Sequence, residues 1–179
     1  MASDCARVYE RVESCRETGF FDLSSCKLTQ IPNGVLMVLK SSRDPDVDPP
    51  ITRCSVANNL LKNLPSKLIK EEILFGGLEV LDLSANKISQ LPAEIEKMKQ
   101  LTELNLAENK FEFLPEIVWS LPEMKSVSFA GNGIASVNVT RIRDASKLKR
   151  LDLSKNPIEE TVKAELLAFA KEKDISLQL

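Results

Sequence analysis

The chain of 179 residues suits one domain or one short repeat array, and 43% of its residues are apolar, enough for a continuous core. Lys and Arg number 24 and Asp and Glu 26, so the net charge of -2 gives no electrostatic basis for binding nucleic acid or an anionic membrane surface. The sequence contains no histidine, which removes the commonest general base and the commonest metal ligand.

Residues 3–17 are predicted to form an amphipathic helix, with Ser3 as a candidate N-cap and Gly19 as the stop, so that residues 1–17 would cap one end of the molecule. This stretch is charged throughout and lacks the apolar run of a signal peptide, and no segment of the chain has the roughly 18 consecutive apolar residues of a membrane span. The predicted apolar stripe consists of Cys5, Val8, Val12 and Cys15.

One apolar pattern recurs six times between residues 18 and 158, with starts near residues 18, 51, 78, 101, 124 and 148. The clearest copy consists of Leu78, Leu81, Leu83, Asn86, Ile88, Leu91 and Pro92. Cys26 replaces the asparagine in the first copy. Six copies in register place the pattern far above chance.

Each copy is predicted to begin with a short half-buried strand and then to turn. In Leu81-Asp82-Leu83 two apolar residues flank a polar one, the alternation of a strand with one buried face. A backbone that turns a corner leaves amides that no neighbouring strand can pair, and an inward asparagine side chain can serve them. Stacked asparagines are therefore expected to form a structural ladder of Asn59, Asn86, Asn109, Asn132 and Asn156.

A short helical segment is predicted on the outer side of each coil. Leu91, Ile95 and Met98 recur at helical spacing, and Pro92 suits the first position of a helical turn. The same placement recurs at Leu68, Val118 and Leu121. Strands about 4.8 Å apart on one side and wider helices on the other force curvature. The predicted fold class is therefore α/β: a right-handed solenoid with a concave parallel sheet and short α- or 3-10-helical segments on the convex side.

Two segments depart from the repeat. Residues 41–50 contain three prolines and three aspartates and are expected to be an inserted, flexible, exposed loop. The aspartates suggest a calcium loop, but the glycine and the bidentate glutamate that such a loop needs are missing. Residues 159–179 are expected to cap the other end with a helix over 159–173 and a seventh strand over 175–179, which indicates a complete array.

The 23-residue unit LxxLxLxxNxLxxLPxxIxxMxx resembles the intracellular class of leucine-rich repeats. The resemblance covers roughly residues 18–162. It implies the solenoid fold and a role in protein interaction, since this class occurs in scaffolds that bind Ras-like GTPases, phosphatase subunits and junction proteins. It supplies no activity that could be carried over to residues of this chain. Cys26 and the longer second unit, with Glu71-Glu72, depart from the pattern and put local geometry in doubt.

No arrangement of residues points to catalysis. The P-loop, GxGxxG, GxSxG and CxxC motifs are absent, and Gly131-Asn132-Gly133 falls on the asparagine turn. Cys26 and Cys54 occupy inward positions. We therefore expect no enzymatic activity, no cofactor and no metal site. The uneven spacing of the four cysteines favours reduced thiols and a cytoplasmic location, with the nucleus left open.

The outward strand positions define a candidate protein-binding surface on the concave face. Its residues are Arg53, Asp82, Glu103, Asn105, Ser128, Arg150 and Asp152. The acidic centre consists of Glu79, Asp82, Glu103 and Glu108, and the basic C-terminal end consists of Lys125, Lys149, Arg150 and Lys155. An ordinary solvated face is an equal alternative for any single charge.

Aromatic residues off the repeat positions are candidate anchors, because aromatic side chains are enriched among interface hot spots. Phe113 and Trp119 are expected near the lower edge and the convex side, with Trp119 partly exposed. Local packing is the better interpretation of Phe75.

These observations predict a monomeric, non-enzymatic adaptor that binds a protein partner on the concave face, with neither nucleic acid nor membrane as a partner. The alternative is a regulatory subunit of a phosphatase or of a small GTPase pathway. That alternative needs a strong continuous hot-spot patch, and the predicted concave face is poor in aromatic residues.

Overall fold

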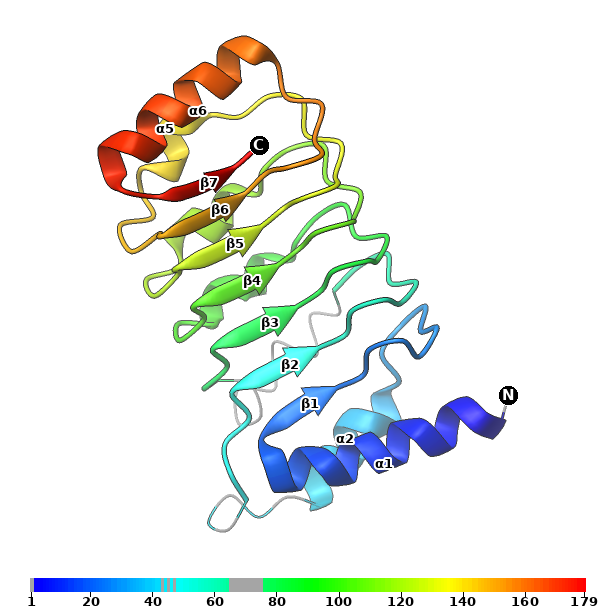
Figure 1. The fold of residues 1–179 in the computed structure, drawn as a ribbon. Helices are drawn as coiled ribbons and strands as arrows, with labels where there is room; N and C mark the ends of the chain where they lie inside the picture. The colour runs from blue at the N-terminus through cyan, green and yellow to red at the C-terminus, as the bar shows by residue number, and fades with distance from the viewer. Residues whose placement is uncertain (1, 43, 45, 47, 65–75) are drawn as a thin grey trace.

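Seven short strands form one parallel sheet in which the spatial order follows the order of the chain (Figure 1). The structure is a computed structural model, and it describes residues 2–42, 44, 46, 48–64 and 76–179. The strands are β1 Phe20–Asp22, β2 Arg53–Ser55, β3 Val80–Asp82, β4 Glu103–Asn105, β5 Ser126–Ser128, β6 Arg150–Asp152 and β7 Ser176–Gln178.

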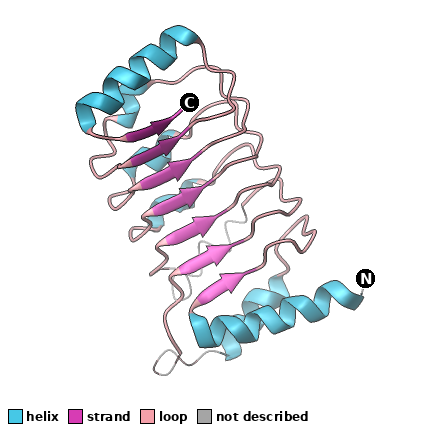
Figure 2. Ribbon diagram, in the orientation of Figure 1, coloured by secondary structure: helices cyan, strands magenta, loops and turns pink. Residues whose placement is uncertain are grey.

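The helices of the described residues lie behind the sheet and at its two ends (Figure 2). They are α1 Ala2–Thr18, α2 Asn33–Ser42, the 3-10 helices η1 Ala93–Lys97 and η2 Glu116–Ser120, α5 Val139–Ile142 and α6 Glu160–Lys173. The α1 helix lies beside β1, and α6 lies beside β7 at the opposite end (Figure 1). This arrangement is the right-handed α/β solenoid predicted from the repeat pattern.

The core runs the length of the array as stacked apolar layers. The central residue of every strand from β1 to β6 points inward and is buried, and the register places these residues in one column, as with Leu81, Leu104 and Val127. The residue after each of these strands, such as Leu83 or Leu106, forms a second buried column. Because each layer packs against the layers beside it, the repeats bury together an apolar face that one repeat alone would leave exposed.

The N-terminal helix differs from its prediction at one end. The α1 helix begins at Ala2, so Ser3 lies inside it and the predicted N-cap was wrong. Serine has only a moderate helix penalty, so the helix can include it and begin at Ala2. At the other end Gly19 has a φ of +68° and its N–H donates to the carbonyl oxygen of Cys15 at 2.9 Å. A Cβ at Gly19 would collide with the carbonyl oxygen of Pro50, so glycine is required there.

The aspartates of the segment after α2 form hydrogen bonds with one another. The α2 helix buries Val35, Leu36 and Leu39 and continues to Ser42, two residues into the predicted loop. Beyond it, the Asp48 N–H donates to the Asp44 carbonyl oxygen at 2.8 Å, and the Asp46 N–H donates to Asp44 Oδ1 at 3.0 Å. The described aspartates of this segment therefore close a turn. Among the described residues no cluster of three potential metal ligands occurs.

The convex helices correct two details of the sequence prediction. Pro92 and Pro115 are the N-cap residues of η1 and η2, one position before the first helical residue. Trp119 was expected to be partly exposed but is only 3% exposed, so that expectation was wrong. Its ring lies 6.5 Å from the ring of Phe129, and the long indole side chain reaches the core from a position that Glu96 occupies as an exposed residue in η1. Leu68 and Phe75 lie outside the described residues.

The C-terminal end consists of α6 and β7, as the sequence predicted. The α6 helix buries Leu166 and Phe169, and the Leu153 N–H donates to the carbonyl oxygen of Gln178 in β7 at 2.8 Å. Arg143 bonds both oxygens of Glu172, at 2.8 and 2.9 Å, which lowers the pKa of Glu172 and raises that of Arg143. No helix in the described ranges is long and apolar enough to cross a bilayer.

Candidate protein-binding surface

The parallel register aligns the outward side chains of the strands in two rows. The first residues of the strands form what we name the entry row: Phe20, Arg53, Val80, Glu103, Ser126, Arg150 and Ser176. The third residues form the exit row: Asp22, Ser55, Asp82, Asn105, Ser128, Asp152 and Gln178. The structure thereby brings the seven predicted binding residues together on one face.

These seven residues line a shallow depression of about 470 Å³ over β2 to β6. Three small residues, Ala107, Ser126 and Ala130, also line the depression. Val80 adds an apolar spot between Arg53 and Glu103. The depression is therefore open and mostly polar, and several of the side chains that line its C-terminal half are small.

The exit row has a structural task that the sequence analysis missed. Asp82 Oδ1 accepts the N–H of Ser84 at 2.9 Å, and Asn105 Oδ1 accepts the N–H of Ala107 at 3.1 Å. The same bond to the backbone two residues later recurs at Asp22, Ser55, Ser128 and Asp152. These are Asx and Ser turns, in which a short polar side chain serves the backbone as the chain leaves the strand. The preference for Asp, Asn or Ser at this position was the signal available in the sequence.

The entry row carries the exposed charges. Arg53, Glu103 and Arg150 are exposed, and in the described part of the chain none of them forms an ion pair. The guanidinium of Arg53 lies 5.2 Å from the centre of the Phe20 ring, a cation–π contact that holds this side chain over the first two strands. The entry row is therefore free to contact a partner without breaking a turn.

The asparagine ladder fixes the backbone under this surface. Asn109 Oδ1 accepts the N–H of Ile88 in the preceding coil at 3.0 Å, while Nδ2 donates to Leu83 and Leu106 carbonyl oxygens at 2.9 and 3.2 Å. Equivalent bonds between coils recur at the other four positions of the ladder. All five side chains are buried except that of Asn156, which is half-buried near the C-terminal end.

The residue before each ladder position adopts a left-handed backbone, another feature that the sequence analysis missed. The residues are Asn58, Ala85, Glu108, Gly131 and Lys155, and Ser25 before Cys26 in the first repeat adopts the same conformation, with φ between 51° and 66°. Gly131 is the one glycine in this set, so residue type gives little warning of the conformation. The left-handed residue lies in the turn where the ladder asparagine points inward and bonds the backbone of two coils.

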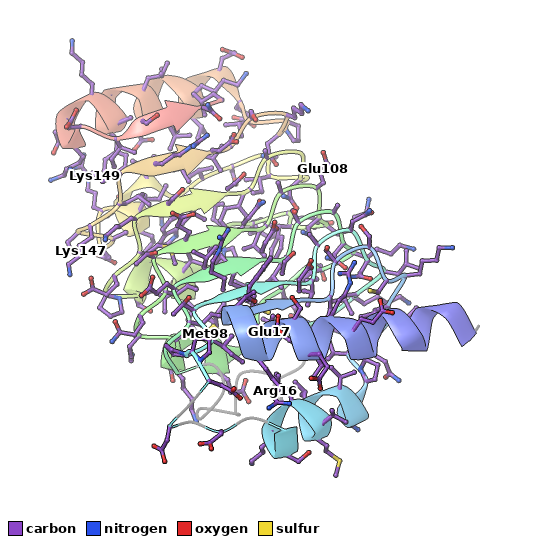
Figure 3. All side chains as sticks on the ribbon, turned by 60° about the horizontal axis from the view of Figure 1, so that its bottom comes forward. Arg16, Glu17, Met98, Glu108, Lys147 and Lys149 are labelled. Atoms are coloured by element: carbon purple, nitrogen blue, oxygen red, sulfur yellow. The ribbon has the colours of Figure 1, made fainter. Side chains whose placement is uncertain are left out.

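Charges at the edges of the sheet follow the predicted distribution along the array. Glu79 and Glu108 are exposed near its middle, and Lys125, Lys149 and Lys155 are exposed towards its C-terminal end. Figure 3 shows Lys147 and Lys149 at one edge of the sheet and Glu108 at the opposite edge. Lys147 pairs with Glu123, so its charge is partly neutralised.

The cysteine side chains that the structure describes are buried. Cys15, Cys26 and Cys54 lie in the core, and Cys26 and Cys54 are free thiols. Burial raises the pKa of Cys54 far above its ordinary value, and the neighbouring Cys15 adds to the shift. A buried neutral thiol is a weak nucleophile, so its environment favours a structural role. Phe113 is 70% exposed, as predicted, and stands outside the concave face as a separate apolar feature.

Comparison with known proteins agrees with this architecture. Residues 76–134 match the family model described as leucine rich repeat. The human PH domain leucine-rich repeat-containing protein phosphatase 1 is 34% identical over 103 residues, which are 57% of this chain and 6% of that protein. The mouse leucine-rich repeat and calponin homology domain-containing protein 1 is 29% identical over 80% of this chain and 18% of its own length.

A solved leucine-rich-repeat protein of Leptospira interrogans superposes with a TM-score of 0.66 at 25% identity, covering 86% of this chain and 35% of its own. The fold and its exposed sheet face are typical of repeat proteins that act as protein-interaction modules. The chain folds as a leucine-rich-repeat solenoid, and its residues 76–134 carry the sequence pattern of that family. It spans less than a fifth of the length of the two curated relatives described above, 6% and 18%.

Proposed function

We propose that the chain is a non-enzymatic adaptor that holds a protein partner on its concave sheet face, with the entry row making the specific contacts. The observation that carries the proposal is that the side chains of the two rows have different roles. The exit row bonds the backbone, whereas Arg53, Glu103 and Arg150 are exposed charges with no ion pair among the described residues.

Rigidity supports the proposal. The sheet register, the ladder and the turns hold the backbone of the entry row in place before any partner arrives. A surface that is ordered in advance loses less conformational freedom on binding, so more of the contact energy remains as affinity.

The organisation proposed for the chain is one domain over residues 1–179, with six repeats over 18–158 between a helical cap and a helix–strand cap. We further propose a monomer in a reducing compartment, the cytoplasm. The buried free thiols of Cys26 and Cys54 support this location, because disulfides form and persist mainly in oxidising compartments.

A charge-reversal variant of the entry row tests the binding face. The variant combines Arg53→Glu, Glu103→Arg and Arg150→Glu, which leaves every turn bond of the exit row intact. Its control combines Lys97→Glu, Glu96→Arg and Lys99→Glu on the exposed convex side, with the same change in net charge. Each protein is used to capture partners from cytosol, and a photo-crosslinker at Ser126 reports whether a captured partner lies on the concave face.

We expect a partner that binds wild type and the convex control, crosslinks at Ser126 and is lost from the entry-row variant. A partner that all three proteins retain, or one that never crosslinks at Ser126, would refute concave binding and direct attention to the convex side.

A further inference from the structure

The charges of the entry row alternate in sign along the array. The register aligns Arg53 on β2, Glu103 on β4 and Arg150 on β6, with Val80 and Ser126 on the strands between them. The row therefore presents a positive, a negative and a positive charge on every second strand. Edge residues outside the row reinforce this order, because Glu79 is exposed beside β3 and Lys149 is exposed beside β6.

The spacing of these charges indicates which secondary structure of a partner could place opposite charges over all three. Neighbouring strands lie about 4.8 Å apart, so charges on every second strand stand roughly 10 Å apart. An α-helix returns to the same face after seven residues, about 10.5 Å along its axis. An extended strand advances about 3.3 Å per residue, so the residue three positions on, at about 10 Å, points to the opposite face.

A polyproline helix also repeats near this distance, about 9.3 Å for three residues. Its known binding sites are grooves lined with aromatic rings. The outward residues of the seven strands include one aromatic, Phe20, and that ring lies beneath Arg53. The small lining residues Ser126, Ala107 and Ala130 leave room in the depression for the wider cross-section of a helix.

We infer that the partner element is an α-helix that lies along the array, with an acidic residue over Arg53, a basic residue seven positions on over Glu103 and an acidic residue seven further on over Arg150. This inference rests on the proposed function and specifies the partner of the same surface. The three contacts are at the solvent-exposed entry row, so they set orientation and selectivity more than total affinity.

Three helical peptides of about 21 residues test the pattern. They share one alanine-rich background and carry Glu-Lys-Glu, Lys-Glu-Lys or Glu-Glu-Lys at positions seven residues apart. Glu-Lys-Glu reads the same in both directions, so the direction of the helix does not matter. Glu-Glu-Lys has the same net charge in a different order. NMR titration of the full chain gives the affinity and locates the binding site.

We expect wild type to bind Glu-Lys-Glu about tenfold more tightly than Lys-Glu-Lys at low ionic strength, and more tightly than Glu-Glu-Lys. The preference should weaken as salt is added. It runs against the net charge of -2, which by itself would favour the more basic peptide. The variant with Arg53→Glu, Glu103→Arg and Arg150→Glu should invert the preference and bind Lys-Glu-Lys most tightly.

Equal affinities for Glu-Lys-Glu and Glu-Glu-Lys would overturn the inference, as would a ranking that follows net charge alone. Tighter binding of a proline-rich peptide with the same charges every third residue would show that the partner element is a polyproline helix and not an α-helix. A partner captured by wild type and lost from the entry-row variant would preserve the proposed function even then, so the two failures are separable.

Discussion

At the scale of single residues, the ladder asparagines bond backbone groups at the turns that no neighbouring strand can pair, and a left-handed residue precedes each of them. Asn109 satisfies one amide and at least two carbonyl groups, and its partners belong to its own coil and to the preceding coil. The sequence pattern predicted which residues form the ladder, because they recur at one position of the repeat. It did not predict the left-handed residue before each one, because Ser, Asn, Ala, Glu, Gly and Lys all occupy that position.

Replacing Asn109 with alanine should lower the free energy of unfolding by about 2–3 kcal/mol. The substitution leaves the buried N–H of Ile88 and the carbonyl oxygens of Leu83 and Leu106 without their partner. Asn156→Ala is the matched control and should cost about 1 kcal/mol, since Asn156 is half-buried and water can replace its bonds. Urea denaturation measures both values. An Asn109→Ala variant as stable as wild type would show that the ladder contributes nothing.

The left-handed positions give a pair of substitutions with opposite expected signs. Ala85 has a φ of 51°, so Ala85→Gly should raise the free energy of unfolding by about 0.5–1 kcal/mol, the strain relieved being larger than the added chain entropy. Gly131→Ala should lower it by about 1 kcal/mol, because φ is +66° there. The added Cβ would lie 3.4 Å from Glu108 Cγ, an ordinary contact, so backbone conformation decides the sign. Thermal unfolding measures the stability of both variants. A shift of the unfolding temperature in the same direction for both would contradict this account.

At the scale of elements, the sequence predicted what the repeat period determines and missed what local packing determines. The strands, the capping helix and the seventh strand follow from apolar spacing, and they lie where that spacing places them. The burial of Trp119 depends on packing against the distant Phe129. The start of α1 and the continuation of α2 to Ser42 do not follow from the repeat period. On the candidate surface, alternation predicted which residues point outward, but the turn bonds of the exit row needed coordinates.

The packing of η2 leads to a spectroscopic prediction. Trp119 is the sole tryptophan of the chain and is 3% exposed, with its ring against Phe129. Its fluorescence should therefore be blue-shifted and protected from acrylamide in the native protein, and both properties should be lost on unfolding in urea. Phe129→Ala should shift native emission to the red by opening the site to water, whereas Phe113→Ala, at an exposed position, should not. Native emission typical of a solvated indole would contradict the packing of η2.

At the scale of the whole molecule, the sheet is a one-dimensional stack. Each strand pairs only with the strands before and after it in the chain, so stability is the sum of the repeats and of the interfaces between neighbours. The binding surface inherits this arrangement. The entry row spans five consecutive strands between Arg53 and Arg150, so its spacing is preserved only while the coils between β2 and β6 stay stacked. The central coils therefore matter most for function.

This one-dimensional order predicts a gradient of hydrogen exchange along the array. The N–H groups of Leu106 and Leu153 are a matched pair: both residues are fully buried, and both bonds to the next strand measure 2.8 Å. They differ in place, because Leu106 bonds to β5 inside the stack, whereas Leu153 bonds to Gln178 in β7, the last strand of the sheet. An interior coil opens only by losing two interfaces, and the last coil opens by losing one.

Native-state hydrogen exchange should therefore give a larger opening free energy for the Leu106 amide than for the Leu153 amide. Asn109→Ala should reduce that difference by weakening the central coils. Equal opening free energies at both amides would mean that the array unfolds as one cooperative unit, and the mutation would then lower protection at β4 and at β6 alike.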